Sequence, residues 1–198
     1  MRGIDTTVDL SDRIGELTRY RVEFAGRYVN LDSYWKCLNL SEAATLRRAG
    51  ISIFPIFEAN PTSVDYFTRD QSVSDLNQVL ISVKHFEIPS SACLFFAVDY
   101  DASEDDLPAI REYFSDIIRS VRNRRANGYE FPGIGVYGSG RVLAEIKRYW
   151  DVRTWLSMST GWAGYDAMKA ECDVIQLAPE GDIGFDHDLD SAKNNYGF

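Results

Sequence analysis

The sequence has few of the residues on which several common protein classes depend. It contains three cysteines, Cys37, Cys93 and Cys172, and two histidines, His85 and His187. The cysteine spacings match no zinc or redox motif and their number is odd, so we interpret them as buried thiols and expect no metal. Neither histidine lies in a nucleophile or metal motif, which disfavours a Ser-His-Asp or histidine-rich metal mechanism. We therefore expect no cofactor.

The chain also lacks long hydrophobic runs and an excess of positive charge. No apolar stretch reaches the 18 or so residues of a membrane span, and no apolar signal-peptide core follows the start Met-Arg-Gly-Ile-Asp, so we expect no membrane insertion. Lys and Arg number 21 against 30 Asp and Glu, a formal charge of −9 with a pI near 4.7. Such a surface repels a phosphate backbone, and nucleic acid is not an expected partner.

Apolar strands alternate with amphipathic helices along the chain. The predicted strands lie around Ile4 and at 26–29, 51–57, 93–98, 134–137, 154–156, 174–177 and 183–185, and the main predicted helices at 41–49, 73–83, 103–121 and 142–149. Strands that are apolar on both faces and alternate with helices are typical of a parallel sheet covered by helices. The pattern predicts an α/β fold, a TIM-like (β/α)8 barrel forming a single domain over residues 1–198. About five βα units are regular, and helices are reduced or missing after the last strands because the connections there are too short.

Acidic residues follow most of the predicted strands. In a parallel barrel the functional face lies at the C-terminal ends of the strands. These ends carry Asp5, Glu58, Asp99, Asp101, Asp186 and Asp188, with Tyr137 and Gln176 at two others. Each acid alone is better explained as a helix cap or a solvated loop residue. Together they predict one negatively charged cavity in which some pKa values are raised, as a general acid requires.

Asp99 and Asp101 have the spacing of a catalytic pair. In an extended chain residues two apart point the same way, with Cα atoms roughly 6.5–7 Å from one another. Two carboxyl groups about 5 to 9.5 Å apart serve in glycosidic bond cleavage, one donating a proton and the other stabilising or attacking the sugar carbon. The spacing does not distinguish retention from inversion.

Aromatic residues supply a second requirement of a sugar site. Flat rings at or just beyond strand ends are suited to stack on sugars, and the candidates are Tyr28, Tyr137, Trp155 and Trp162. For Trp155 a place in the core is the alternative. Gly138-Ser139-Gly140 opens a predicted helix, and its free N–H groups are suited to hold a carboxylate or an acetamido oxygen.

The order of these strand ends resembles a known family. The segments that carry the resemblance are Gly3-Ile4-Asp5-Thr6, Gly26-Arg27-Tyr28, Pro55-Ile56-Phe57-Glu58, Phe96-Ala97-Val98-Asp99-Tyr100-Asp101, Gly135-Val136-Tyr137-Gly138-Ser139-Gly140, Thr154-Trp155-Leu156-Ser157 and Gly184-Phe185-Asp186-His187-Asp188. Over nearly the whole chain they resemble the glycoside-hydrolase-like barrel domain of actinobacterial cell-surface and phage-related proteins, which looks related to the family 25 muramidases. The resemblance implies a lysozyme-like hydrolase whose partner is peptidoglycan or a related polysaccharide.

The resemblance also implies a location and roles for the acids. The location is extracellular or at the cell wall, with a cytoplasmic or phage-borne protein as the alternative because no signal peptide is seen; we also expect a monomer. In the muramidases the fourth strand ends in Asp-x-Glu with the glutamate as acid. Asp99 is accordingly the stabiliser or nucleophile, and Asp101, one methylene shorter than that glutamate, or Glu58 is the proton donor. The acids expected to orient substrate or tune these pKa values are Asp5, Asp186 and Asp188.

Two alternatives stay open at this point. One is a carbohydrate-binding barrel that has lost turnover, because Asp101 is shorter than the glutamate that it replaces. The other is a divalent-metal hydrolase that uses the acidic rim, since oxygen ligands suit calcium or magnesium.

Overall fold

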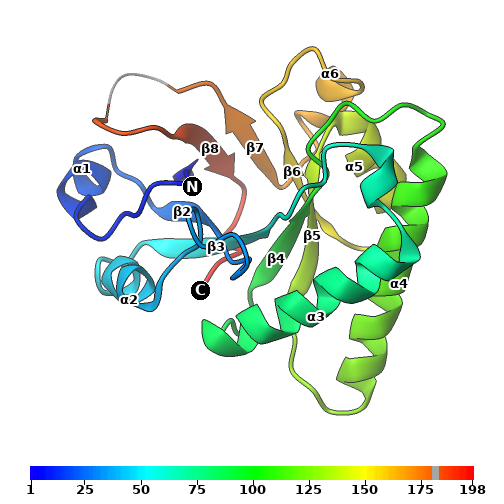
Figure 1. Cartoon of the computed structure of the whole chain (residues 1–198). Helices are drawn as coiled ribbons and strands as arrows, with labels where there is room; N and C mark the ends of the chain where they lie inside the picture. Colours follow the sequence, from blue (N-terminus) through cyan, green and yellow to red (C-terminus); the bar gives the residue numbers. More distant parts are fainter. Residues whose placement is uncertain (180–182) are drawn as a thin grey trace.

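The computed structural model describes residues 1–179 and 183–198 and contains a closed barrel of eight strands. The elements in chain order are β1 (Arg2–Asp5), α1 (Ile14–Arg19), β2 (Phe24–Tyr28), α2 (Leu40–Arg48), β3 (Ser52–Phe57), the 3-10 helix η1 (Val64–Tyr66), α3 (Arg69–His85), β4 (Cys93–Ala97), α4 (Leu107–Ala126), β5 (Gly133–Gly138), α5 (Gly140–Tyr149), β6 (Arg153–Leu156), α6 (Tyr165–Met168), β7 (Val174–Leu177) and β8 (Asp188–Ala192). Figure 1 shows α3, α4 and α5 gathered on one side of the barrel, with α1 and α2 on the other.

The strands pair in the order of the chain. Each strand from β1 to β6 is parallel to the next, which confirms the predicted TIM-like α/β barrel. The helices shorten late, as expected, because α6 has four residues and the described residues between β7 and β8 contain no helix.

The eighth strand differs from the prediction in position and direction. Residues 183–185 form no strand; β8 begins at Asp188 and is antiparallel to both β7 and β1. A parallel return requires a crossover of about a dozen residues or more, and the connection from Leu177 to Asp188 is shorter, whereas an antiparallel return needs only a loop. The N-terminal end of β8 therefore lies at the functional rim, with Asp188 paired to Asp5.

Aromatic rings fill the barrel interior, and glycines on neighbouring strands make room for them. Phe24, Phe95 and Trp155 are fully buried there. A Cβ atom on Gly3 would lie 2.3 Å from the Phe24 ring, and one on Gly135 would lie 2.4 Å from the Phe95 ring. The close-packed interior thus leaves space for a ligand only at the ends of the barrel.

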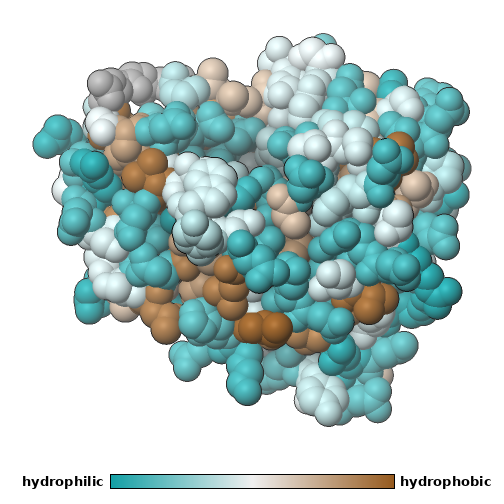
Figure 2. Space-filling view, viewed as in Figure 1, coloured by the Kyte–Doolittle hydropathy of each residue, from teal (hydrophilic) through white to brown (hydrophobic). Residues whose placement is uncertain are grey.

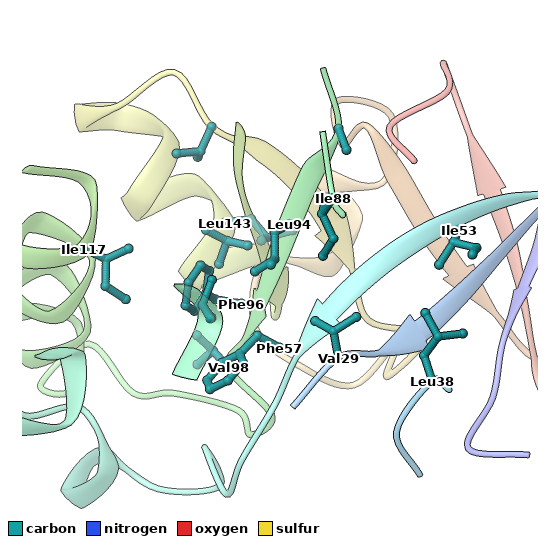
Figure 3. Close-up of a cluster of buried hydrophobic side chains, with 14 of the residues drawn as sticks. Val29, Leu38, Ile53, Phe57, Ile88, Leu94, Phe96, Val98, Ile117 and Leu143 are labelled. Carbon is teal, nitrogen blue, oxygen red and sulfur yellow. The ribbon is translucent and has the colours of Figure 1, made fainter. Parts of the chain in front are cut away.

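A second apolar layer lies between the barrel and its helices. In Figure 3, Leu94 and Phe96 of β4 lie near Leu143 of α5, with Ile117 of α4 on the helix side. Phe95, between the two β4 residues, points into the barrel instead, as the period-2 geometry of a strand requires. Burial on both faces explains why β4 reads as an unbroken apolar run.

The outer surface is mainly hydrophilic in the face seen in Figure 2, with hydrophobic residues in small separate groups. Among the described residues no helix combines the length and the apolar character needed to cross a bilayer. The C-terminal segment closes the barrel at the end where β4 begins. There the Cys93 N–H donates a 2.8 Å hydrogen bond to the Tyr196 carbonyl.

Candidate active site

A cavity of about 290 Å³ opens at the end of the barrel where β1 to β7 finish, the end expected to carry the site. Most of the predicted site residues line it, namely Asp5, Tyr28, Glu58, Asp99, Tyr137, Trp155, Trp162, Gln176 and Asp188. The other lining residues are Ile56, Ser157, Met158 and Ser159. Barrel closure thus brings together carboxyl groups that lie far apart in the sequence.

A larger cavity of about 550 Å³ lies at the opposite end, where Cys93, Gly133 and Arg153 begin β4, β5 and β6. Of the described residues that line it, Asp151 alone is acidic. Carboxylate-based cleavage needs two acids, so the smaller cavity is the candidate active site.

Asp5 ends β1 deep in the smaller cavity and is 6% exposed. Gln176 Nε2 donates a hydrogen bond of 2.9 Å to Asp5 Oδ2. Burial and, second, the negative charge of Asp188 raise the pKa of Asp5 to about 7. An aspartate with such a pKa holds and releases a proton near neutral pH.

Gln176 is the centre of a hydrogen-bond network in the cavity wall. Besides Asp5, its Nε2 group reaches Asp188 Oδ2 at 3.0 Å. Its Oε1 atom accepts hydrogen bonds from the Tyr137 hydroxyl at 2.9 Å and from the Met158 N–H at 3.1 Å. These partners fix the orientation of the amide, so Gln176 holds the two carboxylates in place.

Glu58 forms an ion pair with Lys36, a residue that the sequence did not single out. The side chains are 18% and 8% exposed, and the Lys36 ammonium also lies 4.2 Å from the centre of the Tyr28 ring. Burial raises the pKa of Glu58, and Lys36 opposes that rise. A lysine in the loop between β2 and α2 carries no sequence pattern that points to the end of β3, so only the fold reveals the pair.

Asp99 follows β4 and is half-buried in the cavity wall. Its backbone N–H donates a 2.9 Å hydrogen bond to the Pro61 carbonyl. Burial raises the pKa of the Asp99 carboxyl, with the charge of Lys36 as the opposing influence. The charge of Asp99 in turn raises the pKa of Glu58, so these two acids are close enough to interact.

Asp101 lies outside the cavity, so the expected pairing of Asp99 with Asp101 is not formed. The expectation assumed an extended chain, whereas residues 100–102 form a turn with a 3.0 Å backbone hydrogen bond. The exposed Asp101 carboxylate accepts a 2.9 Å hydrogen bond from the Ala163 N–H instead. Asp101 therefore holds the loop that carries Trp162.

Asp188 lines the cavity, whereas Asp186 lines a smaller hollow beside it. Asp188 is the first residue of β8 and lines the cavity. Asp186 lines the adjacent hollow of about 90 Å³, and its backbone carbonyl accepts a hydrogen bond from the Thr6 hydroxyl. Burial and, second, the charge of Asp186 raise the pKa of Asp188. Asp186 thus influences the cavity through its charge.

The predicted aromatic residues differ in exposure. Trp155 is fully buried, with its ring centre 5.1 Å from that of Phe95 at an interplanar angle of 87°. It belongs to the barrel core, and its burial rules out the expected face-on stacking against a sugar. Tyr28 and Tyr137 are partly buried in the wall, and Trp162 is half-buried in the loop after β6.

Asp190, which the sequence did not single out, lies in the barrel interior and is 1% exposed. Trp155 Nε1 donates a 2.9 Å hydrogen bond to Asp190 Oδ1, whereas Oδ2 has no hydrogen-bond partner among the described residues. Burial and, second, the charge of Asp5 raise the pKa of Asp190 well above its usual range. Both effects favour the protonated form of the Asp190 carboxyl. Asp188 and Asp190 are two residues apart, a spacing that places both on one face of a strand and would have pointed to Asp190. This signal was missed because the eighth strand was predicted at 183–185.

The N-terminus of α5 is engaged by the chain itself. The Arg141 N–H donates a 2.8 Å hydrogen bond to the Ala163 carbonyl, and the Val142 N–H donates one of 3.3 Å to Ser139 Oγ. The expectation that these groups are free to hold a ligand oxygen is wrong, because the loop after β6 packs against the helix start.

The described residues contain no group of three or more His, Cys, Asp or Glu side chains placed to hold a metal ion. The cysteines are free thiols, and Cys93 and Cys172 are buried as interpreted from the sequence, while Cys37 is half-buried. Burial raises the pKa of all three thiols.

The structure is a closed α/β barrel whose cavity at one end gathers several carboxyl groups. Residues 16–184 match the family described as Rv2525c-like, glycoside hydrolase-like domain, and the chain belongs to this family. The family resemblance expected from the strand ends is thereby confirmed.

The chain is also similar to individual proteins. The chain is 28% identical over 160 residues to FadG of Bacillus subtilis (strain 168), a match that covers 78% of this chain and 27% of FadG, so the chain spans about a quarter of that relative. In fold it is similar to the Mycobacterium tuberculosis Tat-secreted protein Rv2525c in complex with L-tartrate, with a TM-score of 0.75, 16% identity, and coverage of 98% of this chain and 95% of that chain. It is also similar to the modular autolysin LytC from Streptococcus pneumoniae in complex with a synthetic peptidoglycan ligand, with a TM-score of 0.58, 11% identity, and coverage of 96% and 46%.

Proposed function

We propose that this chain is a glycoside hydrolase that acts on cell-wall polysaccharide, either peptidoglycan or a related aminosugar polymer. The observation that carries the proposal is the convergence of Glu58 and Asp99, in unlike surroundings, on one cavity that aromatic rings also line. Two carboxyl groups in different protonation states are what acid/base cleavage of a glycosidic bond requires. Membership of a glycoside-hydrolase-like family and the peptidoglycan ligand of LytC support the substrate class.

In this mechanism Asp99 is the proton donor and Glu58 the anionic partner. The Lys36 ammonium favours the ionised form of Glu58. Burial raises the pKa of Asp99, which favours its protonated form, and its carboxyl group lines the cavity where a glycosidic oxygen would lie. This assignment reverses the role expected of Asp99 from the sequence, and Asp101 transfers no proton because it lies outside the cavity.

Cleavage begins when Asp99 passes its proton to the glycosidic oxygen. The bond between that oxygen and the anomeric carbon breaks, the electron pair stays on the leaving oxygen, and Glu58 stabilises the positive charge that develops on the sugar. Water then adds to the anomeric carbon and returns a proton to Asp99. Asp5 and Asp188, held by Gln176, bind polar substituents of the sugar.

The test is release of reducing ends from peptidoglycan and from chitin oligomers. We expect Asp99→Asn and Glu58→Gln each to lower the rate by about 100-fold or more, a loss typical of removing a general acid or a charge-stabilising group. The matched controls Asp105→Asn and Glu112→Gln change exposed acids and should keep the wild-type rate. A wild-type protein that releases no reducing ends, or an Asp99→Asn variant that releases as many, contradicts a hydrolase.

A carbohydrate-binding barrel without turnover is the second candidate. The position of Asp101 favours it, because the acid that the muramidase resemblance implies is turned away from the cavity and bonded to the Ala163 N–H. A binding-only barrel retains polysaccharide affinity in Asp99→Asn while the wild type releases no reducing ends. The same assay, combined with a polysaccharide pull-down, therefore separates the two candidates.

We further propose that the protein acts at the cell wall, from outside the cell or as part of a phage particle. The Tat-secreted Rv2525c and the autolysin LytC support this location. Fractionation of cells that produce the natural protein should place it in the wall or culture fraction, and confinement to the cytoplasm would contradict the location.

A further inference from the structure

Two large aromatic side chains outside the cavity are mostly exposed to solvent. Tyr34 is 86% exposed and Trp35 is 68% exposed, in the loop between β2 and α2. Large aromatic groups contribute most when buried, so such an exposed pair marks a surface that binds something.

Backbone hydrogen bonds hold the loop that carries these two rings. They occupy the centre of a turn in which the Lys36 N–H donates a 3.1 Å hydrogen bond to the Ser33 carbonyl. Beyond the turn the Leu38 N–H returns to the Tyr28 carbonyl at 2.8 Å, which ties the loop to the end of β2.

Lys36 connects this turn to the candidate active site. Its ammonium pairs with Glu58, lies 4.2 Å from the centre of the Tyr28 ring, and lies 5.7 Å from the centre of the Trp35 ring. Glu58 and Tyr28 both line the cavity. Trp35 therefore lies beside the rim of the cavity on the side of β2. The Lys36 ammonium lies between the Trp35 ring and Glu58, the proposed anionic partner.

An aromatic residue also borders the opposite side. Trp162 lines the cavity from the loop after β6, and Met158, which is 38% exposed, lines it from the same connection. In the closed ring of eight strands, β2 and β6 are diametrically opposed. Glu58 and Asp99, which follow β3 and β4, thus lie between Trp35 on the β2 side and Trp162 on the β6 side in the order of the ring.

We propose that Tyr34 and Trp35 form a distal sugar-binding subsite, so that the cavity takes an internal stretch of a linear glycan rather than its end. This inference rests on the proposed function and adds a second binding position on the polysaccharide, several sugar rings away from the bond that is cleaved. Aromatic faces bind the apolar face of a pyranose, and Lys36 supplies a donor for hydroxyl or acetamido oxygens between the subsite and the cavity.

The experiment compares binding of a chitin disaccharide and a chitin hexasaccharide by calorimetry. We expect Trp35→Ala to weaken binding of the hexasaccharide by about tenfold, which corresponds to about 1.4 kcal/mol, and to change binding of the disaccharide less than twofold. Trp35→Phe, which retains a ring, should recover most of the loss. Tyr129→Ala is the control, since Tyr129 is 65% exposed but precedes β5 at the opposite end of the barrel.

Each other outcome has a definite meaning. If the wild type binds both oligomers and Trp35→Ala weakens neither or both equally, the distal subsite is wrong while the proposed function stands. If the wild type binds neither chitin nor peptidoglycan, the proposed function and the subsite fail together. A concentration-dependent dimer that Trp35→Ala abolishes would identify a second copy of the chain as the occupant and overturn the glycan assignment.

Discussion

Trp155 Nε1 donates a hydrogen bond of 2.9 Å to Asp190 Oδ1, although the two residues come from β6 and β8, which are not neighbours in the barrel. Both side chains are buried, and Asp5 lies next to Asp190. Two adjacent buried carboxyl groups cannot both be ionised cheaply, so burial and the charge of Asp5 raise the pKa of Asp190 and favour its protonated form.

Substitutions at Asp190 should therefore depend on hydrogen bonding rather than on charge. Asp190→Asn preserves an acceptor for Trp155 and a donor for Asp5, and we expect the free energy of unfolding to change by no more than about 1 kcal/mol. Asp190→Ala leaves the indole N–H unpaired and should lower it by about 2–3 kcal/mol. Urea unfolding at pH 7 measures both, with the exposed neighbour Ser191→Ala as control. Equal losses in the two Asp190 variants would show that the charge matters instead.

The raised pKa of Asp5 has a consequence for stability. Between about pH 4, its unfolded value, and about pH 7, its folded value, the folded chain holds a proton that the unfolded chain has released. Stability conferred by this group is complete below pH 4 and is lost as the pH rises towards 7, by at most about 1.4 kcal/mol per pH unit.

Asp5→Asn should remove this dependence. We expect the wild type to lose stability relative to Asp5→Asn as urea unfolding is repeated from pH 4.5 to pH 7.5. The raised pKa values of Glu58, Asp99 and Asp188 act in both proteins, so the difference in stability between the two isolates the effect of Asp5. Asp105→Asn, at an exposed site, should follow the wild type. A constant difference between the wild type and Asp5→Asn over this range contradicts a proton held by Asp5.

Lys36 is expected to control the ionisation of Glu58. Lys36→Met removes the group that lowers the pKa of Glu58, so that pKa should rise further, as measured by carbon NMR of the glutamate carboxyl. Because the variant leaves a largely buried carboxylate without its cation, we also expect a loss of about 3 kcal/mol in the free energy of unfolding.

A matched control exists for this ion pair. Lys169 pairs with Asp166 on the surface, where solvent screens the charges, and Lys169→Met should leave the stability unchanged. If Lys36→Met leaves the Glu58 titration where it was, Lys36 does not control that carboxyl group.

Asp101 should act as a positioning residue. Asp101→Asn keeps an acceptor for the Ala163 N–H, whereas Asp101→Ala removes it and frees the loop that carries Trp162. We expect glycan affinity to fall by about tenfold in Asp101→Ala only, the equivalent of a net hydrogen bond, with the pH profile of turnover unchanged in both variants. An Asp101→Asn variant as inactive as Asp99→Asn would instead make Asp101 an acid.

Some strands and site residues could be predicted from the sequence and others could not. Local patterns gave the positions of β3, β4 and β5 and placed Asp5, Glu58 and Asp99 at one rim, because apolar runs and the polar residues that end them are adjacent in the chain. The same patterns missed β8, because its two acids at 188 and 190 interrupt the apolar run by which the other strands were identified. They therefore missed Asp190 as well. They also missed Lys36, because its partner lies on another strand.

The amino-acid order alone determined the alternation of strands and helices, the closed α/β barrel, and the acidic and aromatic character of the rim at the C-terminal ends of its strands. Only the tertiary structure decided which of these groups meet: Glu58 with Lys36, Asp5 with Gln176 and Asp190, and Asp101 with the Ala163 N–H. The reason is that secondary structure follows from neighbours in the chain, whereas contacts between loops depend on where the ring closes and in which direction its last strand runs.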